Sequence, residues 1–139
     1  MWNWLRKLER AAPPSALRGS PVKPRLKTYS AATGYVFQYV YRGHRSAPRE
    51  TGEPATEYVF SVTRDRKTFF PVSVWMAEVV VMQWSELHHR ELSAAEMYAI
   101  AKLSLFEAFD ERETVGQSNT QIEADREAIG RHLQALGRL

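Results

Sequence analysis

The chain has 139 residues, of which 44% are hydrophobic and 12% aromatic, so it is long enough to form one domain with a sizeable core. It has no cysteine, which excludes disulfides, thiolate zinc sites and cysteine nucleophiles. Charged residues interrupt the first ten positions, where a signal peptide would be apolar. No apolar run approaches the length of a membrane-spanning helix, which is about 20 residues. We therefore expect a cytoplasmic protein without a transmembrane segment.

The net charge of +3 conceals a gradient along the chain. Residues 1–30 carry seven basic groups and one acidic group, whereas residues 78–139 carry six basic and eleven acidic groups. A basic arm of this kind either seeks an anionic partner or lies on the acidic part of its own protein. Composition alone does not separate these two interpretations.

The first ten residues predict a short amphipathic helix, because Trp2, Leu5 and Leu8 fall on one side at helical spacing, with Trp4 near them in the sequence. Four prolines in residues 12–28 then predict an extended linker. Tryptophan beside Arg and Lys is typical of a segment that docks on a partner or on a membrane interface, so Trp2 and Trp4 are candidate binding residues. The alternative is that both tryptophans pack on their own domain.

Residues 33–42 predict the first strand of a sheet. Tyr35, Phe37, Tyr39 and Tyr41 alternate with other residues and therefore share one face.

Two further alternating runs, 56–64 and 68–76, flank a charged triplet at 65–67, which is typical of a β-hairpin. Residues 43–55, between the first strand and the hairpin, are rich in Gly, Pro and charge and predict a mobile loop.

After the hairpin the hydrophobic period becomes helical. A first helix is predicted over 75–90, although its valines leave a long third strand as the rival interpretation. Ser93 and Glu96 form a capping box that predicts a second helix ending near Arg112. A single apolar stripe predicts a last helix over 120–136.

These elements predict an α+β fold. We expect an antiparallel sheet of about three strands, followed by two or three helices packed on one face, in a single domain of residues 29–139. An extended basic N-terminal arm, residues 1–28, precedes this domain.

Metal-ligating patterns are few. Glu86 and His89 lie one helical turn apart, as in di-iron bundles, but those sites need a second such motif and further glutamates. We therefore predict no metal site and no cofactor.

Catalytic patterns are also few. Glu107 and Asp110 lie one turn apart, which is more typical of an exposed acidic face than of an acid–base pair. His44 and His132 have no orienting group nearby in the sequence. We predict no catalytic residue, although groups from distant segments can still converge in the fold.

Two basic clusters accompany the predicted sheet. Arg42 and Arg45 lie at the end of the first strand, whereas Arg64, Arg66 and Lys67 surround the hairpin tip, so antiparallel pairing separates the two clusters. Arginine near tyrosine can neutralise phosphates and stack on bases, which makes these residues candidates for nucleic-acid binding. The alternative is that the tyrosines simply pack beneath the helices.

The absence of a recognised catalytic motif favours a small non-enzymatic interaction or ligand-binding module, with a protein partner or self-association. A nucleic-acid-binding accessory protein is the first alternative. An enzyme whose site is assembled from distant residues is the second.

Overall fold

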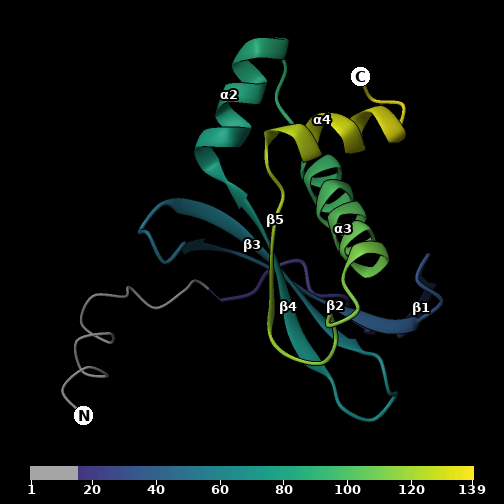
Figure 1. The fold of residues 1–139 in the computed structure, drawn as a ribbon. Coiled ribbons are helices and arrows are strands. Elements are labelled where there is room, and N and C mark those ends of the chain that lie inside the picture. The colour runs from purple at the N-terminus through teal and green to yellow at the C-terminus, as the bar shows by residue number, and fades with distance from the viewer. Residues whose placement is uncertain (1–15) are drawn as a thin grey trace.

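The computed structural model describes residues 16–139, so the helix predicted around Trp2 and Trp4 lies outside the described residues. The elements follow in the order β1 (Lys27–Ser30), β2 (Val36–Pro48), β3 (Pro54–Thr63), β4 (Phe70–Ala77), α2 (Glu78–His88), α3 (Ala94–Glu111), β5 (Thr120–Glu123) and α4 (Arg126–Ala135). The labelled helices lie on one side of the sheet (Figure 1). The described chain is therefore α+β.

The strands form one mixed sheet in the order β1-β2-β3-β4-β5, in which β4 and β5 run parallel and the other pairs antiparallel. The prediction of an antiparallel sheet of about three strands is therefore wrong in the number of strands and in the direction of one of them. Both missed strands, β1 and β5, have four residues, which is too short for an alternating pattern to be recognised. β1 lies where the predicted arm meets the predicted domain, and β5 lies at the start of the predicted last helix.

The second strand, β2, is longer than the sequence predicts, because it continues past a β-bulge at Arg42. The segment predicted as a mobile loop, 43–55, instead belongs to β2 and β3 apart from the connection at 49–53. A bulge inserts one extra residue into a strand, so the alternation that reveals strands in a sequence is interrupted here.

The predicted hairpin is confirmed by the antiparallel pairing of β3 with β4. At its tip the Asp65 carboxylate accepts hydrogen bonds from the amides of Thr68 and Lys67, at 2.9 and 2.8 Å, and from the Thr63 hydroxyl at 3.0 Å. These hydrogen bonds lower the pKa of Asp65 to about 2, and the bond from the Thr68 amide has the largest effect. Asp65 is therefore ionised at neutral pH, and its carboxylate stabilises the turn through these hydrogen bonds.

The capping box at the start of α3 is also confirmed. The Ser93 hydroxyl accepts a hydrogen bond from the Glu96 amide at 3.1 Å, and the Glu96 carboxylate accepts one from the Ser93 amide at 3.0 Å. The two flanking helices start later than predicted, because β4 continues to Ala77 and because β5 precedes α4. Asp125 caps α4 by accepting a hydrogen bond from the Ala128 amide at 2.8 Å.

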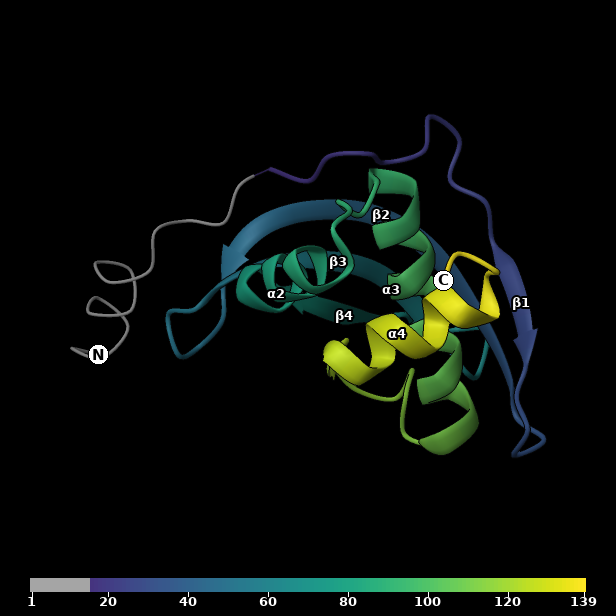
Figure 2. The same ribbon diagram turned by 90° about the horizontal axis from the view of Figure 1, so that it is seen from above.

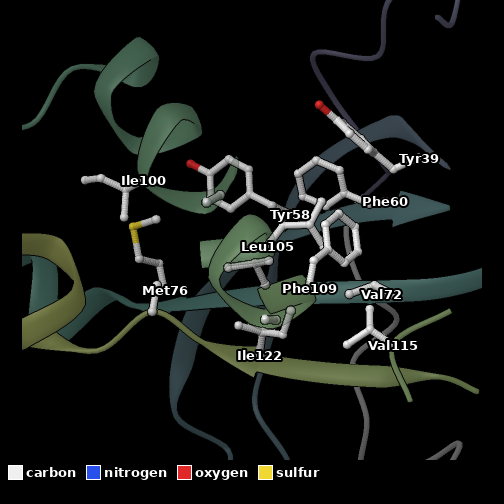
Figure 3. Packing of buried hydrophobic residues seen from close by; sticks show 14 of the residues in the cluster. Tyr39, Tyr58, Phe60, Val72, Met76, Ile100, Leu105, Phe109, Val115 and Ile122 are labelled. Atoms are coloured by element: carbon white, nitrogen blue, oxygen red, sulfur yellow. The ribbon is translucent and has the colours of Figure 1, made fainter. Parts of the chain in front are cut away.

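The core lies between the sheet and α3 and is rich in aromatic rings (Figure 3). The rings of Phe37 and Phe109 stack with centroids 4.4 Å apart, and Phe60 is fully buried beside them. The aromatic face predicted for the first strand is therefore packed beneath helices. Tyr41 lies at the end of this face, where the core gives way to a cavity.

Candidate functional site

A cavity of about 670 Å³ lies where the first described residues, β2, β3 and the start of α3 meet. Its volume is typical of a small-molecule site. The described lining contains arginine, histidine and tyrosine but no aspartate or glutamate. We call it the tyrosine cavity, and the described residues that line it are Arg18, Gly19, Tyr41, His44, Arg45, Ser46, Thr56, Tyr58, Ala94, Ala95, Met97 and Tyr98.

The β-bulge in β2 places Tyr41 and His44 on the same face of the sheet. Tyr41 pairs with Phe60 and His44 pairs with Tyr58, so both side chains point to the helical side although they are three residues apart. The Tyr41 hydroxyl and the Nδ1 atom of His44 are 3.2 Å apart. Without the extra residue, the alternation of the strand would direct His44 to the opposite face.

Residues 18–20 of the basic arm are attached at this bulge and form one wall of the cavity, running beside β2 (Figure 2). Arg18 and His44 exchange both backbone hydrogen bonds, at 2.7 and 2.9 Å, and the Ser20 hydroxyl donates to the Arg42 carbonyl at 2.5 Å. A Cβ atom on Gly43 would lie 2.6 Å from the Arg18 carbonyl oxygen. This close approach of the two backbones therefore requires glycine.

Tyr41, Tyr58 and Tyr98 bring phenol hydroxyls to the cavity. Burial raises the pKa of Tyr58 to about 12 and also raises the pKa values of Tyr41 and Tyr98. These phenols therefore remain protonated at neutral pH and can donate hydrogen bonds. The Tyr58 residue is 4% exposed, and its hydroxyl has no hydrogen-bond partner within residues 16–139.

The first turn of α3 adds backbone donors. Ala94 and Ala95 line the cavity, and amides at the start of a helix have no carbonyl partner within the helix. The capping box satisfies only the amides of Ser93 and Glu96. Because the first residues of α3 line the cavity, the positive end of the helix dipole faces it. The Glu96 carboxylate does not line the cavity and is paired with Arg90.

A second cavity, of about 360 Å³, adjoins the first, because Thr56 and Met97 line both. We call it the methionine groove. It lies between α2, the end of β4 and the start of α3, and apolar side chains form most of its wall. Among residues 16–139 its lining is Thr56, Met76, Glu78, Val81, Met82, Ser85, Glu91, Leu92 and Met97.

The predicted binding residues Arg42 and Arg45 both have partners on β3. Arg42 donates to the Ser61 hydroxyl at 2.9 Å, and Arg45 donates to the Glu57 carboxylate at 2.7 Å. Glu57 neighbours Tyr58 on β3 and therefore faces the side of the sheet opposite the helices. It also accepts a hydrogen bond from the Ser73 hydroxyl at 2.6 Å.

The other predicted binding residues, Arg64, Arg66 and Lys67, lie at the hairpin tip. The Arg64 guanidinium lies 4.0 Å above the Tyr35 ring and also donates to a backbone carbonyl, whereas Arg66 and Lys67 are exposed. Arg64 is seven residues beyond Glu57, the partner of Arg45, or about 23 Å along the chain of an extended strand. The two arginine clusters are therefore separate, and nucleic-acid binding by either one stays a prediction.

The Glu86 and His89 pair lies on exposed positions at the end of α2. Residues 16–139 contain no group of three or more His, Asp or Glu side chains arranged to hold a metal ion.

Glu107 and Asp110 make structural contacts. Arg131 on α4 donates two hydrogen bonds to Glu107, at 2.8 and 3.0 Å, and Asp110 accepts one from the Tyr29 hydroxyl at 2.8 Å. The two carboxylates thus attach α3 to α4 and to β1.

The sequence did not reveal the cluster of His44, Tyr58 and Tyr98, because these residues come from three separate elements. One signal was present: Gly43 follows an alternating strand pattern, and glycine in a strand often marks a bulge or a close backbone approach.

Comparison with protein-family models, with curated proteins and with solved structures finds no match to this chain. Among the helices described for residues 16–139, none combines the length and the apolar character needed to cross a bilayer.

Proposed function

We propose that the protein is a non-enzymatic module that binds a small organic ligand in the tyrosine cavity. The observation that carries this proposal is the convergence of hydrogen-bonding groups from four segments on one cavity of about 670 Å³. A site of this kind, with aromatic walls and a few directed polar groups, is the usual form of a ligand pocket.

The polar groups of the cavity support binding because they are left available by the fold. The buried ring of Tyr58 carries a hydroxyl without a partner in residues 16–139, and the cavity also receives the amides at the start of α3. A ligand that accepts hydrogen bonds from these groups takes the place of water at the cavity wall.

A screen of small organic fragments against the ¹⁵N-labelled chain by NMR tests this proposal. We expect at least one chemical class to shift the amide signals of Tyr58, Ala94, Ala95 and Tyr98 together, because these residues surround one volume. Signals of α4 should stay unchanged.

Two variants locate the binding. Ala95 is exposed and lines the cavity, so Ala95→Trp fills it without disturbing the core and should abolish the shifts. Ala135→Trp, at an exposed position at the end of α4, is the matched control and should leave them intact. Shifts that persist in Ala95→Trp, or a screen without any shift in the cavity, would contradict the proposal.

A further inference from the structure

We infer that the ligand is an amphipathic organic anion with an alkyl chain, whose charged head occupies the tyrosine cavity and whose chain lies in the methionine groove. This inference rests on the proposed function and names the class of ligand. It follows from the contrast between two adjoining cavities, one lined by hydrogen-bond donors and the other by flexible apolar side chains.

The tyrosine cavity suits an anionic head because its described lining contains hydrogen-bond donors and arginine but no carboxylate. Tyr58 is 4% exposed and lines the cavity with a hydroxyl that has no partner in residues 16–139. In Figure 3 this hydroxyl points away from the ring of Phe60. The amides of Ala94 and Ala95 add donors from the start of an 18-residue helix, and small alanine side chains leave those amides accessible.

The charges around this head site favour an anion. Arg18 lines the cavity, whereas the nearest carboxylate in α3, that of Glu96, is neutralised by two hydrogen bonds from Arg90 at 2.8 and 3.0 Å. Glu57, on the opposite face of β3, is paired with Arg45 at 2.7 Å. Glu78 and Glu91 line the methionine groove instead and are exposed. An anion therefore meets less repulsion at the tyrosine end than at the methionine end.

The methionine groove suits an alkyl chain. Met76, Met82 and Met97 approach from β4, α2 and α3, and unbranched methionine side chains adapt to a flexible apolar ligand. Met97 lines both cavities, so a ligand bound by its head at Tyr58 can pass directly into the groove. Met82 is 57% exposed, so an apolar occupant would cover surface that otherwise faces water.

The experiment compares three probes at concentrations below micelle formation: octanoate, butyrate and 1-octanol. Each is titrated into the ¹⁵N-labelled full chain, with affinities measured by calorimetry. We expect octanoate to bind more than about tenfold tighter than butyrate, because its additional methylenes are buried in the groove. We also expect it to bind more than about tenfold tighter than 1-octanol, which has no charge, and to shift the amide signals of Ala94 and Ala95.

Variants assign the two ends. Met82→Glu places a charge in the groove and should weaken octanoate binding about tenfold while leaving butyrate unchanged. Leu87→Glu, at another exposed position of α2 outside the groove lining, is its control. Tyr58→Phe should weaken both carboxylates about fivefold, whereas Tyr39→Phe, outside the lining of the tyrosine cavity, should not.

The outcomes separate this inference from the proposed function. Equal affinities for octanoate and 1-octanol would overturn the anionic head, and equal affinities for octanoate and butyrate would overturn the alkyl chain. If no probe binds but other fragments shift the cavity signals, the amphipathic ligand is overturned and the ligand-binding function stands. If neither the probes nor any fragment shifts those signals, both proposals are overturned.

Discussion

Arg90 and Glu96 form a bidentate ion pair, in which the guanidinium donates to the two carboxylate oxygens at 2.8 and 3.0 Å. Arg90 follows α2 and Glu96 lies in the first turn of α3, so the pair fixes the connection between these helices. The guanidinium also lies 5.2 Å from the ring centre of Trp84 and donates to the Arg138 carbonyl at 3.1 Å. The same ion pair therefore holds the helix start that forms a wall of the tyrosine cavity.

The Glu96 carboxylate should make the stability of the fold dependent on acidic pH. The hydrogen bonds from Arg90, followed by that of the Ser93 amide, lower the pKa of Glu96 to about 2. A carboxyl group whose pKa is lower in the folded state stabilises the fold above its unfolded pKa of about 4.3, and this stabilisation is lost as the pH falls toward 2. Glu96→Gln should therefore lower the free energy of unfolding at pH 7 and converge with the wild type near pH 2.

Urea unfolding at a series of pH values measures this effect, and Glu86→Gln on the exposed side of α2 is the control. The control should follow the wild-type curve. A constant difference between Glu96→Gln and the wild type from pH 7 to pH 2 would contradict the linkage.

Gly43→Ala should destabilise the protein by about 3 kcal/mol, because it adds a steric clash to an unfavourable backbone conformation. Gly43 has φ = 124°, and a Cβ atom there would lie 2.6 Å from the Arg18 carbonyl oxygen. Gly52→Ala is a matched control, since Gly52 has φ = 87° but no atom within 4 Å of the added carbon. The control should lose only about 1 kcal/mol, from backbone strain alone.

Thermal unfolding and amide hydrogen exchange would check this prediction. Exchange at the Arg18 and His44 amides should accelerate in Gly43→Ala, because these amides join the arm to the bulge. Equal losses of stability in the two variants would show that the close approach of the backbones contributes nothing.

The signals that identified elements correctly in the sequence are local ones. The capping box of Ser93 and Glu96 and the charged turn at Asp65 each involve residues within three positions of one another, so their geometry follows from the sequence itself. The aromatic face of the first strand was likewise visible, because its period of two is a property of any strand. These features were enough to predict an α+β protein.

The features that were missed depend on distant segments. β5 has four residues and forms a strand because β4 offers it a parallel edge, which no local pattern records. The bulge at Arg42 is stabilised by contacts with Arg18 and Ser20, more than 20 positions earlier. The tyrosine cavity depends on this bulge for His44 and on α3 for Tyr98, so its lining could not be assembled from the sequence.

His132 should make the protein less stable below neutral pH. It is 6% exposed, and its Nε2 atom has no hydrogen-bond partner in the described part of the chain. Burial lowers its pKa, while Glu107 opposes the shift and Arg131 adds to it. Because the pKa of His132 is lower in the folded state, the folded protein favours the neutral imidazole. The unfolded chain binds the proton more readily, so the free energy of unfolding decreases as the pH falls below the unfolded pKa of about 6.5.

Replacing His132 with leucine should remove this contribution, so the free energy of unfolding should fall less between about pH 7.5 and pH 5 than in the wild type. His89→Asn is the control, because His89 is exposed and asparagine tolerates its positive φ of 51°. A wild-type slope that is unchanged in His132→Leu would assign the acid sensitivity to other groups.

Arg45 and Arg42 should differ sharply in their importance for stability, although both are arginines of β2. The Glu57 side chain that pairs with Arg45 is only 8% exposed, so Arg45→Met leaves a buried carboxylate with the Ser73 hydroxyl as its remaining side-chain partner. We expect a loss of about 2 kcal/mol in the free energy of unfolding. Arg42→Met removes an exposed contact with Ser61 and should cost about 0.5 kcal/mol or less.

A double variant shows whether the loss comes from the unpaired carboxylate. Because an apolar pair avoids the desolvation of both charges, Arg45→Met/Glu57→Met should recover most of the stability that Arg45→Met loses. Chemical denaturation of the wild type, both single variants and the double variant completes the cycle. If the double variant is less stable than Arg45→Met alone, then Glu57 stabilises the sheet without its arginine, and the unpaired carboxylate is not the cause of the loss.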